Sequence, residues 1–195
     1  MRATWVLGAG LLLSLSLPVQ ATEPAADMGG PLPAVWKEQH LGFSYAGRTS
    51  HYSCDGLREK MRAMLLEMGA RRDLKVSGLG CSSTSPGLRL EFSSPVLPDS
   101  AARPRRARHL IAVAARFEKF VLTSDAFRNF GIADCELVED FSRQILPKLA
   151  TRGVQADITC LPYQKRGSRY VVRGEILRSL PRDQQSAAYL DAVAP

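Results

Sequence analysis

Few residues of this chain have the types and spacing that catalysis requires. His51 has Ser50, Ser53 and Asp55 close by in the sequence, a set that would suit a Ser/His/Asp hydrolase. The nucleophilic serine of such enzymes often stands in a G-x-S-x-G turn, and no serine here has that or a similar setting. The simpler interpretation places His51 at the end of a strand and Asp55 at the start of a helix that it helps to cap. We therefore predict no catalytic residue.

Metal and cofactor sites have no better support. No two histidines have the helical or hairpin spacing that would let them hold one metal ion. Gly78 and Gly80 stand in neither G-x-x-x-x-G-K-[ST] nor G-x-G-x-x-G, the loops that bind phosphates. We therefore predict no metal and no cofactor. The histidines are His40, His51 and His109.

An acidic cluster, Glu136, Glu139 and Asp140, could act in acid–base catalysis or bind a cation. Its expected place is the first turns of a helix, where carboxylates interact favourably with the positive end of the helix dipole. That structural role is sufficient to explain the cluster.

Four arginines, Arg103, Arg105, Arg106 and Arg108, supply more than half of the net charge of +7. They could contact an anionic partner such as lipid headgroups, an acidic glycan or nucleic acid. Nucleic-acid binding is disfavoured because no aromatic residue lies among them. Pro104 and the small residues before them favour a solvated linker between two units, and we predict an arginine-rich linker over 99–109.

Residues 1–21 have the three parts of a secretory signal peptide. Arg2 is followed by an apolar run over 5–17. The segment ends in Val19-Gln20-Ala21, which places small residues at the positions that a signal peptidase recognises. The run is shorter than the roughly 20 residues that span a bilayer. We expect cleavage, with the protein delivered to the periplasm or secreted, and no transmembrane segment thereafter.

Export makes disulfides the expected state of the four cysteines, Cys54, Cys81, Cys135 and Cys160, because the compartment is oxidising and their number is even. Zinc is the alternative. Zinc sites usually contain a close C-x₂₋₄-C pair, which this chain lacks.

Residues 41–98 predict a first unit of strand, helix, strand and strand. An extended segment opens the unit, and Cys54 begins a helix that Gly69 ends with left-handed backbone. Strands over 74–79 and around 88–92 follow. The residues expected on the buried faces are Leu57, Met61, Leu65, Met68, Leu88, Leu90 and Phe92.

Residues 110–180 predict a second unit with the same order of elements. An apolar extended segment over 110–122 comes first, Asp134 is a suitable N-cap for the helix, and Pro147 should kink or end it. Two strands complete the unit. The residues expected on its buried faces are Val138, Phe141, Ile145, Leu149, Tyr170, Val172 and Ile176.

The order strand, cysteine, helix, strand, cysteine, strand thus occurs twice, which indicates a duplicated unit. If each unit is self-contained, Cys54 pairs with Cys81 and Cys135 with Cys160. The predicted fold is α+β: two tandem β-α-β-β units with helices packed on antiparallel sheet. The two sheets either merge or stand apart around the linker. A flexible leader is expected over 22–40, rich in Ala, Gly and Pro towards its start, and a tail over 181–195.

The cysteine-centred segments resemble a group of uncharacterised exported proteobacterial proteins. The matching residues are Y-S-C-D-G-L at 52–57, G-A-R at 69–71, D-C-E-L-V at 134–138 and Cys160. The resemblance covers roughly 43–177 and implies an exported, disulfide-bonded architecture. It implies no activity and no functional residue.

Two classes of function remain. The favoured class is a non-enzymatic binding or interaction module in the periplasm or outside the cell, because no convergent catalytic set is present. The alternative is a hydrolase that acts on envelope material, whose residues would converge only in the fold. Whether His51, Asp55 and a serine meet in a cleft distinguishes the two.

Overall fold

The computed structural model describes residues 30–47, 50–80, 86–98, 111–125, 130–164 and 167–185. The predicted signal peptide, the arginine-rich linker with its four arginines, His109 and Cys81 lie outside these residues. The strands are β1 (Leu32–Ser44), β2 (Lys75–Leu79), β3 (Gly87–Val96), β4 (Ala112–Thr123), β5 (Thr151–Thr159) and β6 (Arg169–Ser179), and the helices are α1 (Cys54–Glu67) and α3 (Cys135–Gln144) with short 3₁₀ turns around α3 and after β5.

All six strands form one sheet in the order β2-β3-β1-β4-β6-β5, and all paired strands are antiparallel. Each half of the chain runs strand, helix, strand, strand, as predicted, and in each half the last strand lies between the other two. The first strands of the two halves, β1 and β4, pair at the centre through 32–35 and 112–115. The α+β fold is confirmed, and of the two arrangements left open by the sequence the structure has the merged sheet.

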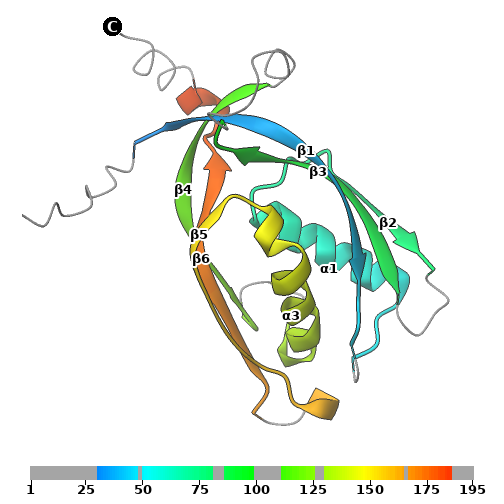
Figure 1. Ribbon diagram of the computed structural model, residues 1–195. Coiled ribbons are helices and arrows are strands. Elements are labelled where there is room, and N and C mark those ends of the chain that lie inside the picture. Colours follow the sequence, from blue (N-terminus) through cyan, green and yellow to red (C-terminus); the bar gives the residue numbers. More distant parts are fainter. Residues whose placement is uncertain are drawn as a thin grey trace, which may run out of the picture.

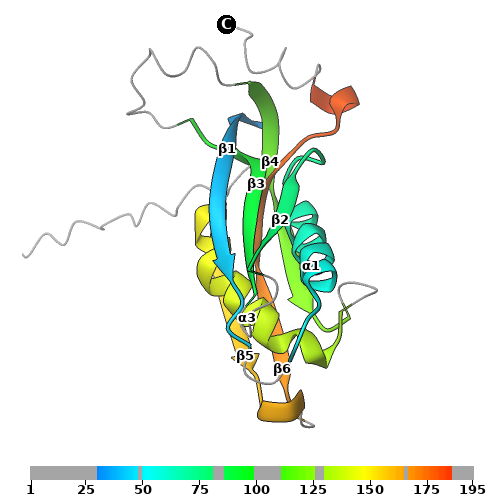
Figure 2. The ribbon, with the colours of Figure 1, turned by 90° about the vertical axis from the view of Figure 1, so that its right-hand side faces the viewer.

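The sheet bends so that its two halves enclose both helices (Figures 1 and 2). One large apolar cluster contains residues from both helices and from both halves of the sheet, so the halves share one core. Every residue named above as expected on a buried face is in this cluster, because strand alternation and helical periodicity point these residues to the same side. Its largest fully buried side chains include Phe43, Leu57, Met61, Leu65, Leu88, Leu90, Leu122, Leu137 and Phe141.

Helix α1 ends where the sequence predicts. Gly69 has φ +77°, and the N–H groups of Gly69 and Ala70 donate to the carbonyls of Leu66 and Leu65 at 3.1 and 2.9 Å. This is a Schellman motif, which satisfies carbonyls that the helix leaves unpaired. At the other end the N-cap is Ser53, whose Oγ accepts the Gly56 N–H at 3.1 Å.

Helix α3 stops at Gln144, and Leu146–Lys148 forms a 3₁₀ turn. Pro147 lies in this turn, so the predicted end of the helix is confirmed, because proline cannot donate a helical hydrogen bond. Asp134 occupies the N-cap position as predicted. Its carboxylate makes no capping hydrogen bond to the helix and is used elsewhere.

The predicted leader over 22–40 is wrong from Leu32 onward, because strand β1 begins there. The small and proline residues at 31–34 suggested irregular chain. Pairing with β4 nevertheless makes the segment a strand, and Ala34 packs there in a small second cluster with Val113 and Leu177. The extended segment that opens the first unit, predicted over 41–52, ends earlier, at Ser44.

The two edges of the sheet differ. At the β5 edge the pairing with β6 shifts register between Arg152 and Gln155, where Gly153 has φ +59°. Such a bulge disrupts an edge and protects it from pairing with other strands. At the β2 edge the register with β3 runs without interruption over 75–79.

A disulfide joins Cys135 and Cys160, as predicted, with Cα atoms 5.6 Å apart. It ties the first residue of α3 to the residue after β5. Cys54 is also disulfide-bonded. Its predicted partner Cys81 lies outside the described residues, so that pairing stays a prediction. Among the described residues, no helix is both long and apolar enough to cross a membrane.

Replacing Cys135 and Cys160 together by alanine should lower the free energy of unfolding by about 3 to 4 kcal/mol, because the unfolded chain loses a loop of this size. Urea unfolding of the oxidised protein and of the double variant measures the difference. Equal unfolding midpoints and slopes would contradict a stabilising role for this bond.

Candidate functional site

The residues of the predicted hydrolase set do not converge. Ser50 is buried and its Oγ donates to the Ala133 carbonyl at 2.8 Å. Ser53 caps α1, and Asp55 pairs with Arg58 at 2.8 Å on the surface, so the expected capping role of Asp55 is wrong. His51 is exposed and, within the described part of the chain, makes no hydrogen bond to any of them. The arrangement offers no nucleophile–base pair.

Two members of the acidic cluster are buried and accept hydrogen bonds from the first half of the chain. Glu136 Oε2 accepts the Ser50 N–H at 3.1 Å, and Asp140 Oδ2 accepts the Ala46 N–H at 2.8 Å. Both N–H groups belong to the loop between β1 and α1. Glu139 takes no part in these bonds. The helix-dipole explanation was incomplete, because these carboxylates also join the two halves.

Asp134 is the most heavily used carboxylate. It is only 3% exposed and accepts hydrogen bonds from the Tyr52 hydroxyl at 2.6 Å, from Lys60 Nζ at 3.0 Å and from the Gly131 N–H at 2.8 Å. Lys60 also lies 4.6 Å from the centre of the Phe130 ring. A buried carboxylate with this many donors is fully compensated.

The loop between β1 and α1 is fixed at two further points. The Tyr45 hydroxyl donates to the Ser50 carbonyl at 2.9 Å, and the side chain of Gln144 bonds both main-chain groups of Ser44, at 2.8 and 3.0 Å. We call the residues that join the halves the inter-half network: Tyr45, Ser50, Tyr52, Lys60, Asp134, Glu136 and Asp140. Sequence patterns could not reveal it, because its hydrogen bonds join residues far apart in the chain.

The tyrosines in and beside the inter-half network are held in their protonated form. Burial and then the Glu136 charge raise the pKa of Tyr45 above its usual range. Burial and the hydrogen bond to Asp134 raise the pKa of Tyr52, and burial and the Asp134 charge raise that of Tyr170. None of them can supply a tyrosinate base near neutral pH.

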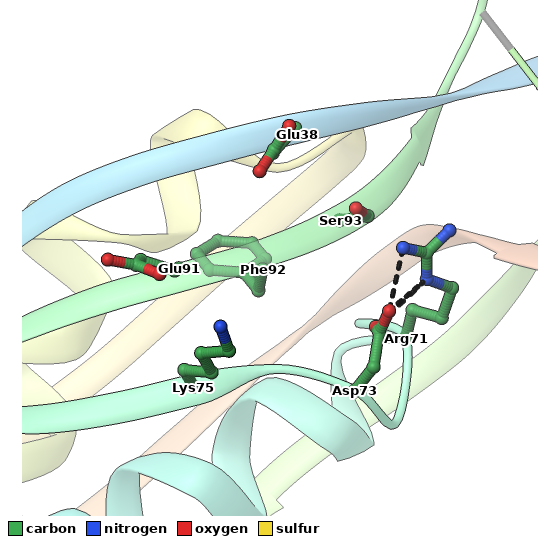
Figure 3. Close-up of a pocket in the computed structure, with 7 residues that line it drawn as sticks. All are labelled: Glu38, Arg71, Asp73, Lys75, Glu91, Phe92 and Ser93. Carbon is green, nitrogen blue, oxygen red and sulfur yellow. Dashed lines mark hydrogen bonds and ion pairs between the residues drawn. The ribbon is translucent and has the colours of Figure 1, made fainter.

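Charged side chains from β1, β3, β2 and the turn before β2 surround one depression of the sheet (Figure 3). This depression, which we call the outer depression, has a volume of about 160 Å³. Strand alternation places Glu91 and Ser93 on the face of the sheet away from the core, because Phe92 between them points into the core. The lining residues are Glu38, Arg71, Asp73, Lys75, Glu91, Phe92 and Ser93.

Arg71 and Asp73 form a fork-shaped ion pair at one end of the outer depression, with Nε–Oδ1 at 2.9 Å and Nη2–Oδ2 at 2.7 Å. This hydrogen bonding lowers the pKa of Asp73, so its carboxylate stays ionised. The Arg71 N–H donates to the Ser93 carbonyl at 2.9 Å, and its guanidinium lies 5.8 Å from the Trp36 ring. The turn before β2 is thereby fixed to the sheet.

Lys75 and Glu91 face each other in the β2–β3 register, and Glu91 faces His40 in the β1–β3 register. Within the described residues neither Lys75 nor Glu91 forms an ion pair, whereas His40 lies 3.3 Å from Glu38. The outer depression therefore presents an ammonium and a carboxylate to any ligand that approaches.

On its other side, β2 is flanked by a second depression of about 410 Å³, which we call the edge groove. It lies between α1 and β2, and its lining residues are Asp55, Arg58, Glu59, Arg62 and Val76. Arg62 crosses from the helix to the turn before β2 and donates to the carbonyls of Leu74 and Arg72 at 2.9 and 3.2 Å. Both depressions can bind polar ligands, and neither contains a catalytic set.

Within the described ranges, no group of three or more histidine, cysteine or acidic side chains could hold a metal ion. Comparison of the chain with models of known families, with curated proteins and with solved structures finds no match.

Asp134→Ala should cost about 3 kcal/mol or more of unfolding free energy, because it leaves Lys60 and the Tyr52 hydroxyl without their acceptor in a buried setting. Asp55→Ala is the matched control, since Asp55 lies near the start of the other helix and is exposed. It should cost less than about 1 kcal/mol. Chemical denaturation of both variants tests this, and equal losses would contradict the structural role of the inter-half network.

The raised tyrosine pKa values predict a loss of stability at high pH. Unfolded tyrosines ionise near pH 10, whereas Tyr45, Tyr52 and Tyr170 do not do so in the folded protein, so alkali favours the unfolded state. Each such tyrosine contributes about 1.4 kcal/mol per pH unit above pH 10. Urea unfolding between about pH 9 and pH 11 should show a smaller loss for Tyr52→Phe than for the wild type. Parallel curves would refute the assignment.

Proposed function

We propose that this chain is an exported, non-enzymatic binding module whose binding surface surrounds β2. One observation carries the proposal. The buried carboxylates and tyrosines are engaged in joining the two halves, whereas Lys75 is exposed, Glu91 is half-buried, and neither forms an ion pair within the described residues. Charged groups of this kind recognise a partner through complementary charge.

Export is supported by the three-part signal sequence at 1–21 and by the resemblance to exported proteobacterial proteins. The disulfide between Cys135 and Cys160 fits an oxidising compartment such as the periplasm or the exterior. The run from Arg103 to Arg108 would then be available for a second, weaker contact with an anionic surface.

We infer further that the two halves arose by duplication of one β-α-β-β unit. The strand order of the sheet supports this, since each half places its last strand between its first and second. The cysteines also occupy matching places: Cys54 and Cys135 are the first residues of their helices. On this basis each unit carries its own disulfide, with Cys81 as the partner of Cys54.

In-cell photocrosslinking tests the proposed function. A photoreactive amino acid at position 75 should give a crosslinked adduct in the periplasmic or secreted fraction, because Lys75 lines the outer depression and its neighbour Val76 lines the edge groove. The control position is Lys119, which is exposed on β4 at a distance from β2. Equal adduct yields at the two positions, or adducts at neither, would argue against a binding surface around β2.

A further inference from the structure

We propose that the edge of β2 binds an extended, acidic segment of a partner polypeptide, which joins the sheet as an additional strand beside α1. This inference rests on the proposed function and specifies its partner. Three properties of the β2 edge carry it: an open row of main-chain groups, a groove with room for alternate side chains, and a local excess of positive charge.

Within the part of the chain that the structure describes, the main-chain groups of β2 pair on one side only, because β2 is the first strand of the sheet and its neighbour is β3. Its register is unbroken over 75–79, so these groups are regularly spaced for another strand. The opposite edge lacks this property, since the bulge at Gly153 interrupts β5. Peptide recognition by strand addition uses such an open, regular edge.

The edge groove gives an added strand room for its side chains. Strand alternation places Val76 and Gly78 on the helix side of β2, and Val76 packs against the core. Gly78 has no side chain to fill the space beside the helix. On α1, Leu66 is 36% exposed and follows Arg62 at helical spacing. An apolar residue of the partner could therefore contact Val76 or Leu66.

The charge around this edge selects the partner. Three cations lie at the start of β2 and in the turn before it, or reach that turn from α1: Arg62, Arg72 and Lys75. Within the described residues none of them pairs with a carboxylate, and Arg62 donates only to main-chain carbonyls. Of the acids that line the edge groove, Asp55 is already paired with Arg58. Glu59, the other acid of the edge groove, is not free either. Glu91 faces Lys75 from β3 and offsets one of the three positive charges, so two remain for an acidic strand to complement.

Lys75 also bears on which strands this edge would accept. Lysine on an edge strand discourages pairing with neutral or basic strands, which would bury its charge. An acidic strand instead gains an ion pair with the same lysine. Lys75 thus disfavours neutral and basic strands and favours acidic ones.

The experiment uses the mature protein and two fluorescein-labelled peptides, one with alternating Glu and Val and one with alternating Lys and Val. Fluorescence anisotropy should show that the acidic peptide binds at least about tenfold more tightly. The double variant Arg72→Glu/Lys75→Glu should weaken its binding by about tenfold or more. The matched control, Lys37→Glu/Lys119→Glu, reverses two exposed charges away from this edge and should change binding by less than about twofold.

Hydrogen exchange identifies the mode of binding. The amides of β2 should become protected when the acidic peptide is added, whereas the amides of β5 should not change. Strand addition is refuted if the acidic peptide does not bind, if it binds the Arg72→Glu/Lys75→Glu protein unchanged, or if it binds without protecting β2. If crosslinks from position 75 persist in any of these cases, the surface around β2 still binds a partner and only strand addition fails.

Discussion

The hydrogen bonds between the start of α3 and the loop after β1 are the interaction on which the rest of the structure depends. Asp134, Glu136 and Asp140 are buried, and an uncompensated buried carboxylate would cost several kcal/mol. Each accepts at least one hydrogen bond from the first half of the chain, including those from the N–H groups of Ser50 and Ala46. The helices can therefore share one core only in the register that satisfies these acids.

Because of that constraint, the ionisable groups of the interior are already used in hydrogen bonds within the protein, whereas groups on the surface around β2 remain open to a ligand. Ionisable groups inside are held by partners, and the tyrosines stay protonated because of burial and nearby carboxylates. The groups around β2 lie on a rigid support, since Arg71 fixes the turn before β2 to β3. Pre-organised charges on a fixed sheet are suited to recognition, because little conformational entropy is lost on binding.

Local patterns in the sequence were sufficient to predict most helices and strands, but they did not predict the contacts between distant segments. The stripe from Leu57 to Met68, Gly69 and Pro147 predicted where helices run and stop, because each acts through its own neighbours in the chain. The beginning of β1 was missed, since its strand character comes from pairing with β4. The role of Glu136 was missed for the same reason: its donors come from the first half of the chain. The open edge of β2 depends on strand order, which periodicity does not encode.

The pairing at the centre of the sheet has a mechanical consequence. The β1–β4 seam consists of four residue pairs, whereas ten join β1 to β3 and nine join β4 to β6. Force that separates the two halves therefore meets few main-chain pairs at this seam. The shared apolar core and the hydrogen bonds of Glu136 and Asp140 lie in its path as well.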